Sequence, residues 1–185
     1  MRGVQENANI GVIRSYDNLM NPRGSAMQGN EQPDLRGAMR RIASSVAVVT
    51  AIGRCGPVGI TATAVTSVSL EPASLLVCIN RATRLYEAVI DSGQFRVSFL
   101  DASQQAVASK FGSSGSDARF STGSWHLGAP AGPRLDGAIA DIACTLHSCL
   151  DHGTHGIFIG TVTDVDVRDG LPLLYCGSSF GQFAA

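Results

Sequence analysis

The chain from residue 45 to residue 176 consists mainly of short apolar runs that are rich in β-branched residues. Such runs, bounded by turn residues, are typical of strands. We expect strands through the hydroxyl-rich residues 61–69 and over 45–52, 74–79, 95–100, 138–150, 157–167 and 171–176. Strands and helices do not alternate regularly, so the pattern predicts a mainly β fold, a Greek-key-like antiparallel barrel with short flanking helices, and not a doubly wound sheet.

Short helices are expected beside this barrel. Asp34 is a candidate N-cap for a helix over 35–43, and Thr83 is one for a helix that stops at Gly93. A third helix is expected over 103–111, before a loop rich in Ser and Gly.

Residues 1–33 differ from the rest of the chain. They are rich in Asn, Gln, Gly and Arg and have no sustained apolar period, which predicts a flexible N-terminal tail. Residues 34–185 are then one domain, long enough to bury a core. Hydrophobic residues make up 44% of the chain and charged residues only 16%, so we expect a homodimer that buries further surface between its subunits.

Charge and composition exclude several classes of function. The net charge is −1 and there is no basic run, so nucleic acid binding has no support. No apolar run reaches the roughly 18 residues that span a membrane, and no secretory signal precedes the domain. Five cysteines, an odd number without a CxxC pair, argue against a disulfide framework. Together these observations predict a cytoplasmic protein.

The segment 59–80, GITATAVTSVSLEPASLLVCIN, carries the strongest sign of a ligand. Small residues and hydroxyls side by side let a flat polar ligand approach the backbone and find hydrogen-bond donors. The alternative is the solvent face of an edge strand, but strict alternation fails at Thr66 and Ser67. Neither GxGxxG after a strand nor GxxxxGK[ST] occurs, so the common nucleotide-binding loops are absent from the sequence.

A metal site is a rival hypothesis. His147, Cys149, Asp151, His152 and His155 place good metal ligands within nine residues, and the first three would share one face of a strand. The two later histidines fall beyond a turn, and no second ligand cluster supports them. We therefore expect no metal.

Several motifs in a consistent order resemble the flavin reductase family with the FMN-binding split-barrel fold, the reductase partners of two-component flavin monooxygenases. The similar stretches cover about three quarters of the chain: RRIASSVAVVTA, GITATAVTSVSLEP, LLVCINRAT, FRVSFL, SKFG, GTHGIFIGTV and PLLYC. The family's Gly-Asp-His motif reads Gly-Thr-His here, with Thr154 in place of Asp. This version is similar to that of reductases in pyrimidine degradation.

The resemblance implies a set of flavin-binding residues. It places the flavin ring against Thr61, Ala62, Thr63 and Ala64, and continues the cradle through Thr66, Ser67 and Val68. It places the ribityl and phosphate end at Asn80, Arg81, Ala82 and Thr83, with Lys110 and Phe111 nearby. A phosphate suits the charges of Arg81 and Lys110 and the N-terminus of the helix after Thr83.

The resemblance also implies the activity. Reduced nicotinamide, NADH or NADPH, would pass a hydride to FMN, with FAD as an alternative flavin, and the reduced flavin would serve a partner monooxygenase. His155 is the candidate catalytic residue, through nicotinamide docking or the electrostatics of reduced flavin, since hydride transfer itself moves no proton. One alternative within the same fold is a reductase with fixed FMN that acts on a bound acceptor such as a cobalt corrinoid. The missing Asp of the motif, and the absence of basic residues after Tyr175, also suit a flavin-binding module without turnover.

Overall fold

The computed structural model describes residues 12–13, 34–113 and 118–183. Most of these residues lie in strands. In chain order the strands are β1 (Val12–Ile13), β2 (Ser44–Ser45), β3 (Ala47–Gly53), β4 (Gly56–Ala62), β5 (Val65–Leu70), β6 (Ala73–Asn80), β7 (Gln94–Phe99), β8 (Trp125–His126), β9 (Arg134–Leu135), β10 (Ala140–His152), β11 (His155–Val167), β12 (Leu173–Cys176) and β13 (Ser179–Gln182).

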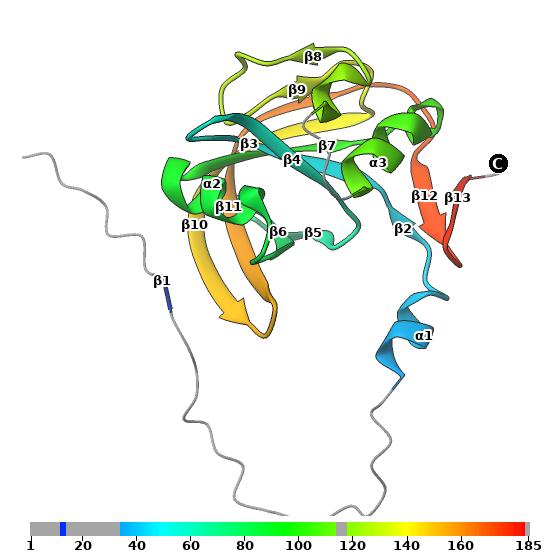
Figure 1. Ribbon diagram of the computed structural model, residues 1–185, viewed down its shortest axis with the longest axis horizontal. Helices are drawn as coiled ribbons and strands as arrows, with labels where there is room; N and C mark the ends of the chain where they lie inside the picture. Colours follow the sequence, from blue (N-terminus) through cyan, green and yellow to red (C-terminus); the bar gives the residue numbers. More distant parts are fainter. Residues whose placement is uncertain (1–11, 14–33, 114–117, 184–185) are drawn as a thin grey trace, which may run out of the picture.

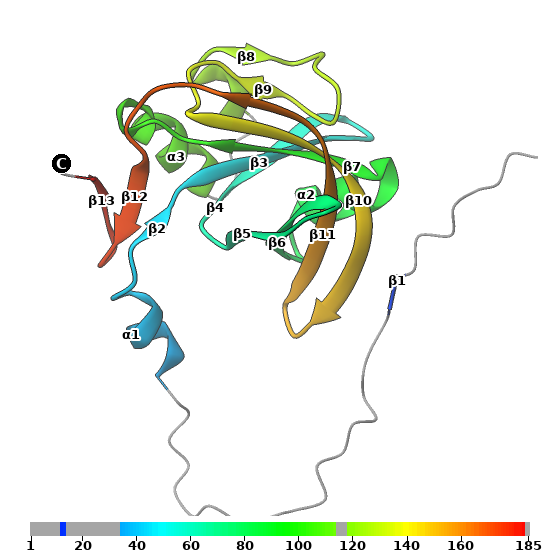
Figure 2. The ribbon, with the colours of Figure 1, turned by 180° about the vertical axis from the view of Figure 1, so that it is seen from behind.

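The helices are short and lie outside the sheet (Figure 1). They are α1 (Leu35–Met39), α2 (Arg84–Ser92) and α3 (Gln105–Gly112), with the 3₁₀ turns η1 (Ala102–Gln104) and η2 (Arg119–Ser121). None of the helices in the described ranges has the length and apolar character needed to cross a membrane. In both views α1 stands away from the barrel (Figure 2).

One curled antiparallel sheet forms the barrel. Its strand order is β4-β3-β7-β10-β11-β6-β5, so its first and last strands follow each other in the chain through Thr63 and Ala64. Smaller sheets, β13-β12-β2 and β8-β9, lie beside it. These observations confirm the mainly β, antiparallel fold with short flanking helices.

Two groups of buried side chains fill the molecule. The first lies inside the curled sheet and under α2, and it includes Val77, Phe95 and Phe158. The second lies on the other side of β3 under α3, and it includes Val48 and Phe111. Burial of residues 47–51 on both faces explains why β3 reads as a nearly continuous apolar run.

The hairpin of β10 and β11 runs the length of the sheet. β7 pairs with the first half of β10, through Thr145, and β1 pairs with Cys149 and Leu150 in its second half. The other strand of the hairpin, β11, contains Gly160, whose missing side chain leaves room for Phe95. A Cβ on Gly160 would lie 2.5 Å from the Cζ of Phe95. Glycine therefore allows the barrel interior to close around this ring.

A buried polar network holds one end of this hairpin. The Asp141 carboxylate pairs with Arg96 and accepts a hydrogen bond of 2.6 Å from the Ser98 hydroxyl. Arg96 also donates to the carbonyls of Pro130, at 2.7 Å, and Gly132, at 3.2 Å. Each buried charge thus has partners, and the network fixes the loop between β8 and β9 against β7.

Most predicted elements are confirmed, with shifted ends. Asp34 caps α1, accepting from the Gly37 N–H at 2.8 Å, but α1 ends at Met39 and not at 43. Thr83 caps α2, and Gly93 ends it with a φ of 65°. The single strand expected through 61–69 is wrong. The chain turns at Thr63 and Ala64, and two strands, β4 and β5, replace it. The predicted tail, residues 1–33, lies outside the described residues except for β1.

Candidate functional site

The turn between β6 and α2 brings four predicted residues together: Asn80, Arg81, Ala82 and Thr83. The Asn80 side-chain oxygen accepts from the Ala82 N–H at 2.9 Å, and the Thr83 hydroxyl donates to the Asn80 carbonyl at 2.7 Å. The same hydroxyl accepts from the Tyr86 N–H at 3.3 Å as the cap of α2. The turn is therefore held by its own polar side chains, and it presents the positive end of a helix dipole.

The tip of the β10–β11 hairpin lies against this turn. The Arg81 N–H donates to the Thr154 carbonyl at 3.0 Å, and His155 is directly opposite Asn80 in the β11–β6 pairing. The Thr154 hydroxyl lies 2.9 Å from His155 Nδ1, so a neutral hydroxyl contacts the ring where the family motif has a carboxylate. Both His155 and Arg81 are exposed. The candidate catalytic residue and the candidate phosphate ligand thus share one corner of the barrel.

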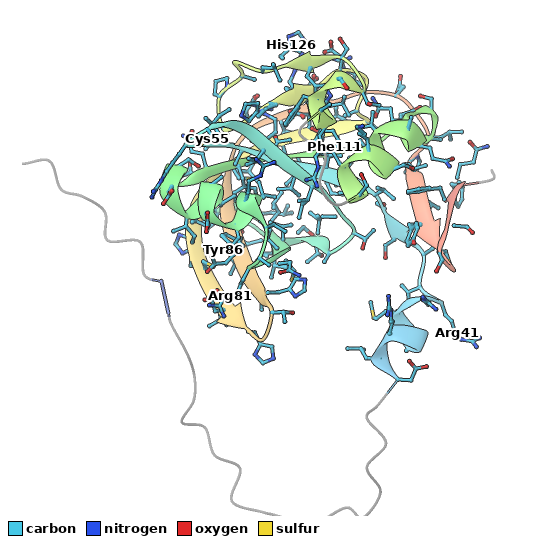
Figure 3. The ribbon with its side chains drawn as sticks, viewed as in Figure 1. Arg41, Cys55, Arg81, Tyr86, Phe111 and His126 are labelled. Carbon is cyan, nitrogen blue, oxygen red and sulfur yellow. The ribbon has the colours of Figure 1, made fainter. Side chains whose placement is uncertain are left out.

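Two hollows flank the turn. One, of about 420 Å³, is lined by Asn80, Arg81, Ala82, Tyr86, Glu87, Gly153 and Thr154. The other, of about 500 Å³, lies between β4, the start of α2 and the end of α3, and Thr61, Ala82, Thr83 and Phe111 are among its lining residues. The labelled side chains of Arg81 and Tyr86 lie near the β10–β11 hairpin, and Phe111 belongs to α3 (Figure 3). Together these hollows offer space on both sides of one polar turn.

The second hollow depends on close contact between β4 and α3. The Thr61 hydroxyl donates to the Ala108 carbonyl at 2.7 Å, and a Cβ on Gly59 would lie 2.9 Å from Phe111 Cε1. Phe111 is fully buried, in ring contact with Phe120 and Trp125. Phe111 therefore supports the wall of this hollow as a core residue. Lys110 belongs to the same helix but lines neither of the two hollows.

Arg119 is a residue that the sequence analysis missed. It lines the second hollow and donates to two carbonyls, that of Gly59 at 2.6 Å and that of Ser113 at 2.7 Å. Its Nε is buried and has no hydrogen-bond partner among the described residues. The only sequence signal was a basic residue before an aromatic one, Phe120, in a loop rich in Ser and Gly.

The rest of the predicted cradle lies apart from this turn. Thr63 lines a third hollow, of about 310 Å³, with Met39 of α1, Arg40 after it and Tyr175 of β12. Ala64 is exposed, and Thr66, Ser67 and Val68 are exposed in succession on β5. A bulge between Ser67 and Ser69 breaks the pairing of β5 with β6, which explains why strict alternation fails there. In the single chain these residues face solvent on an edge strand.

Burial changes the acid–base character of one residue at the turn. Removal from water, together with the hydrogen bond that its hydroxyl donates to Asp151, raises the pKa of Tyr86 to about 12. Tyr86 therefore stays protonated at neutral pH and acts as a hydrogen-bond donor, not as a base.

The metal hypothesis meets a structural obstacle. A bulge in β10 between Leu146 and Ser148 takes His147 out of the pairing with β11, so His147 is exposed while Cys149 is buried. The shared face that the hypothesis required is thereby lost. Within the described ranges, no three His, Cys, Asp or Glu side chains are grouped so as to hold a metal ion.

Comparison with known proteins agrees with this geometry. The sequence model of the family described as "Flavin reductase like domain" matches residues 39–184. An FMN reductase (NADH), RutF, from Pseudomonas syringae pv. syringae is 37% identical over 147 residues, 78% of this chain and 83% of the relative. The reductase component of an FADH(2)-dependent resorcinol hydroxylase from Rhizobium sp. is 40% identical over 146 residues, 77% of this chain and 82% of the relative.

A solved structure has the same fold. The NADH:FAD oxidoreductase of Streptomyces globisporus, in complex with NAD and FAD fragments, superposes with a TM-score of 0.76 and 34% sequence identity. The match covers 81% of this chain and 91% of the other.

Proposed function

Because this chain belongs to the flavin reductase like domain family, we propose that it is an NAD(P)H-dependent flavin reductase that transfers a hydride from reduced nicotinamide to FMN. The observation that supports this most directly is the meeting of the Asn80–Thr83 turn, the start of α2 and His155 at one corner between two hollows. Relatives that are named FMN reductase (NADH) match over most of their length.

The residues at this corner suit a flavin phosphate. Arg81 supplies a half-exposed guanidinium, and the capped N-terminus of α2 supplies partial positive charge beside it. The hydroxyl of Thr61, although it donates to Ala108, keeps a lone pair for a ligand. Bound FMN would supply the ring system that accepts the hydride.

The protein itself acts mainly by positioning. We propose that Arg81 and the α2 N-terminus bind the anionic end of the flavin, and that His155 orients reduced nicotinamide at the hairpin tip. Fixing two activated reactants at contact distance supplies most of the acceleration, because hydride transfer needs no general acid in the chemical step. A neutral hydroxyl beside His155 is compatible with such a docking role.

We also propose a homodimer whose subunit interface covers the exposed strand β5, so that Thr63, Ala64, Thr66, Ser67 and Val68 contribute to the flavin cradle there. Ala62, which was predicted with them, is buried in the core at the end of β4. The exposed apolar side chains of Leu70, Val167 and Val68, at 87%, 70% and 50%, support further burial. A cytoplasmic location is proposed with it, because all five cysteines are free thiols.

The reduced flavin is proposed to serve a partner monooxygenase, since relatives include the reductase component of a resorcinol hydroxylase. A flavin that leaves after reduction should bind no tighter than about micromolar, whereas a fixed FMN that passes electrons to a bound acceptor should bind near nanomolar. Equilibrium dialysis of the purified protein against FMN distinguishes these two modes.

The function is tested by steady-state oxidation of NADH and of NADPH, with FMN, FAD and riboflavin in turn, beside a visible spectrum of the purified protein. We expect NADH oxidation that depends on enzyme and on FMN. No oxidation above the rate without enzyme would refute the proposal and leave a flavin-binding module without turnover.

A further inference from the structure

Asp151 connects two parts of the candidate site. It lies in β10 directly opposite Gly156 of β11, and only 18% of its side chain is exposed. One carboxylate oxygen accepts a hydrogen bond from the Tyr86 hydroxyl at 2.8 Å, and the other lies 3.4 Å from Arg81 Nε. A single carboxylate therefore contacts both the β6–α2 turn and the first turn of α2.

The Tyr86 side of this arrangement is fixed by packing. A Cβ on Gly156 would lie 2.7 Å from Tyr86 Cε2, so the tyrosine ring passes over the bare position in β11. The ring also meets Phe158 edge to face, with centroids 5.3 Å apart. Because Tyr86 stays protonated, its hydroxyl remains a donor to Asp151 and holds the carboxylate in place.

The Arg81 side is less constrained. Its backbone N–H is tied to Thr154, but half of its side chain is exposed in the hollow of about 420 Å³. Over residues 34–113 and 118–183, Asp151 is the only side chain that pairs with the guanidinium. Since Nε faces Asp151, the two terminal nitrogens of the planar group are left to contact a ligand.

We propose that Asp151 is a positioning residue, which holds the Arg81 guanidinium so that its terminal nitrogens meet the phosphate of bound FMN. This inference rests on the proposed function. A half-exposed ion pair contributes little to folding. It does, however, reduce the rotamer freedom that a long side chain would lose when it binds a ligand.

The opposite effect of Asp151 is electrostatic repulsion of the phosphate. Its carboxylate is already paired with Arg81 and hydrogen-bonded to Tyr86, and both contacts offset its negative charge. We therefore expect loss of orientation to outweigh relief of repulsion when the charge is removed. Weaker FMN binding after removal of the charge indicates loss of orientation, and tighter FMN binding indicates relief of repulsion.

The test compares FMN with riboflavin, which lacks the phosphate, by fluorescence titration of the full-length protein. Asp151→Asn keeps an oxygen for the Tyr86 hydroxyl but can turn its amide N–H₂ toward Arg81, so it breaks the ion pair selectively. We expect about fivefold weaker FMN binding, the upper end for an exposed pair, and riboflavin binding changed by less than about twofold. Asp151→Glu, which restores the carboxylate, should return FMN affinity to within about twofold of wild type.

Two further variants complete the test. In an Arg81→Ala background, Asp151→Asn should have no additional effect, because the residue acts through Arg81. Asp91→Asn is the matched control. This change removes a carboxylate of α2 that lies 2.9 Å from the Nε of another arginine, Arg54. It should leave the ratio of FMN to riboflavin affinity unchanged.

The proposal is overturned if Asp151→Asn weakens both flavins equally, tightens FMN, leaves FMN unchanged, or acts as strongly without Arg81. Any of these results in a protein that oxidises NADH with FMN refutes the role of Asp151 and retains the reductase. Absence of NADH oxidation refutes the reductase itself, while the ratio of FMN to riboflavin affinity still reports on Asp151.

Discussion

His155 keeps the histidine of its family motif but lies beside Thr154, where the motif has Asp. Its ring contacts the neutral Thr154 hydroxyl where the family motif has a carboxylate. A ring that is exposed at a hairpin tip, without a charged partner within the described chain, is suited to contact a ligand and not to transfer protons.

We therefore predict that His155→Ala raises the KM for reduced nicotinamide by about tenfold, the cost of roughly one charged or well-placed polar contact. The KM for FMN should change much less. Steady-state kinetics with each substrate varied in turn provides the measurement. A larger effect on the KM for FMN would mean that His155 contacts the flavin.

The thiols give a second prediction for single residues. Burial raises the pKa of Cys144 to about 12 and that of Cys149 to about 11, so both thiols are protonated and unreactive at pH 8. Cys55 is exposed to solvent and to reagents. Labelling with a disulfide reagent at pH 8 should modify Cys55 rapidly, and Cys144 and Cys149 only after denaturant is added. Rapid modification of Cys149 in the native protein would show that the Tyr86 region opens.

The strands and helices show what local sequence can predict. Polar caps at Asp34 and Thr83, and the stop at Gly93, were predictable because capping depends on the residues within one turn of the helix. The turn at Thr63 and Ala64 was not predictable, because it forms only when strands that are distant in the sequence pair and the sheet closes. For the same reason the bulge at His147 left no local signal, and the bulge at Val68 left only the break in alternation near Thr66 and Ser67, although each one changes which side chains face the core.

The residues of the candidate site also fall into two groups, those that local sequence predicts and those that it does not. Residues of one continuous turn, Asn80–Thr83, were predicted together and lie together. Arg119 and Asp151 were not predicted as parts of the site. Arg119 contacts Gly59, 60 positions away in the chain, and Asp151 contacts Arg81, which is also remote in sequence. Such partners become visible only when the barrel has closed.

The glycines of β11 allow a prediction at the level of the strand. Gly160→Ala would place a methyl group 2.5 Å from Phe95 Cζ and 2.9 Å from Cys144 Cβ, inside the barrel core. We expect a loss of about 1–3 kcal/mol in the free energy of unfolding, as for other overpacked cores. Gly181→Ala, in β13, meets nothing within 4 Å and is the control. Urea unfolding of both variants checks this, and equal stabilities would contradict the packing.

At the scale of the whole molecule, the open question is assembly. If the interface covers β5, light scattering at micromolar concentration should give twice the chain mass of 19.3 kDa. Leu70→Glu, which places a charge on the most exposed apolar residue of β5, should shift the protein toward monomers. Leu127→Glu, an exposed leucine after β8, should not. A dimer that tolerates the Leu70 change would place the interface on another surface.

Two gaps in β11, four positions apart, are each filled by a ring from another part of the chain: Tyr86 over Gly156 and Phe95 against Gly160. A shift of β11 by two residues would place side chains where the two rings lie, so packing fixes the register of the hairpin. A reductase that releases its flavin after each turnover must keep the binding corner in shape while nothing occupies it. Here rings packed against a strand supply that stiffness, so we expect the corner to keep its shape without bound flavin.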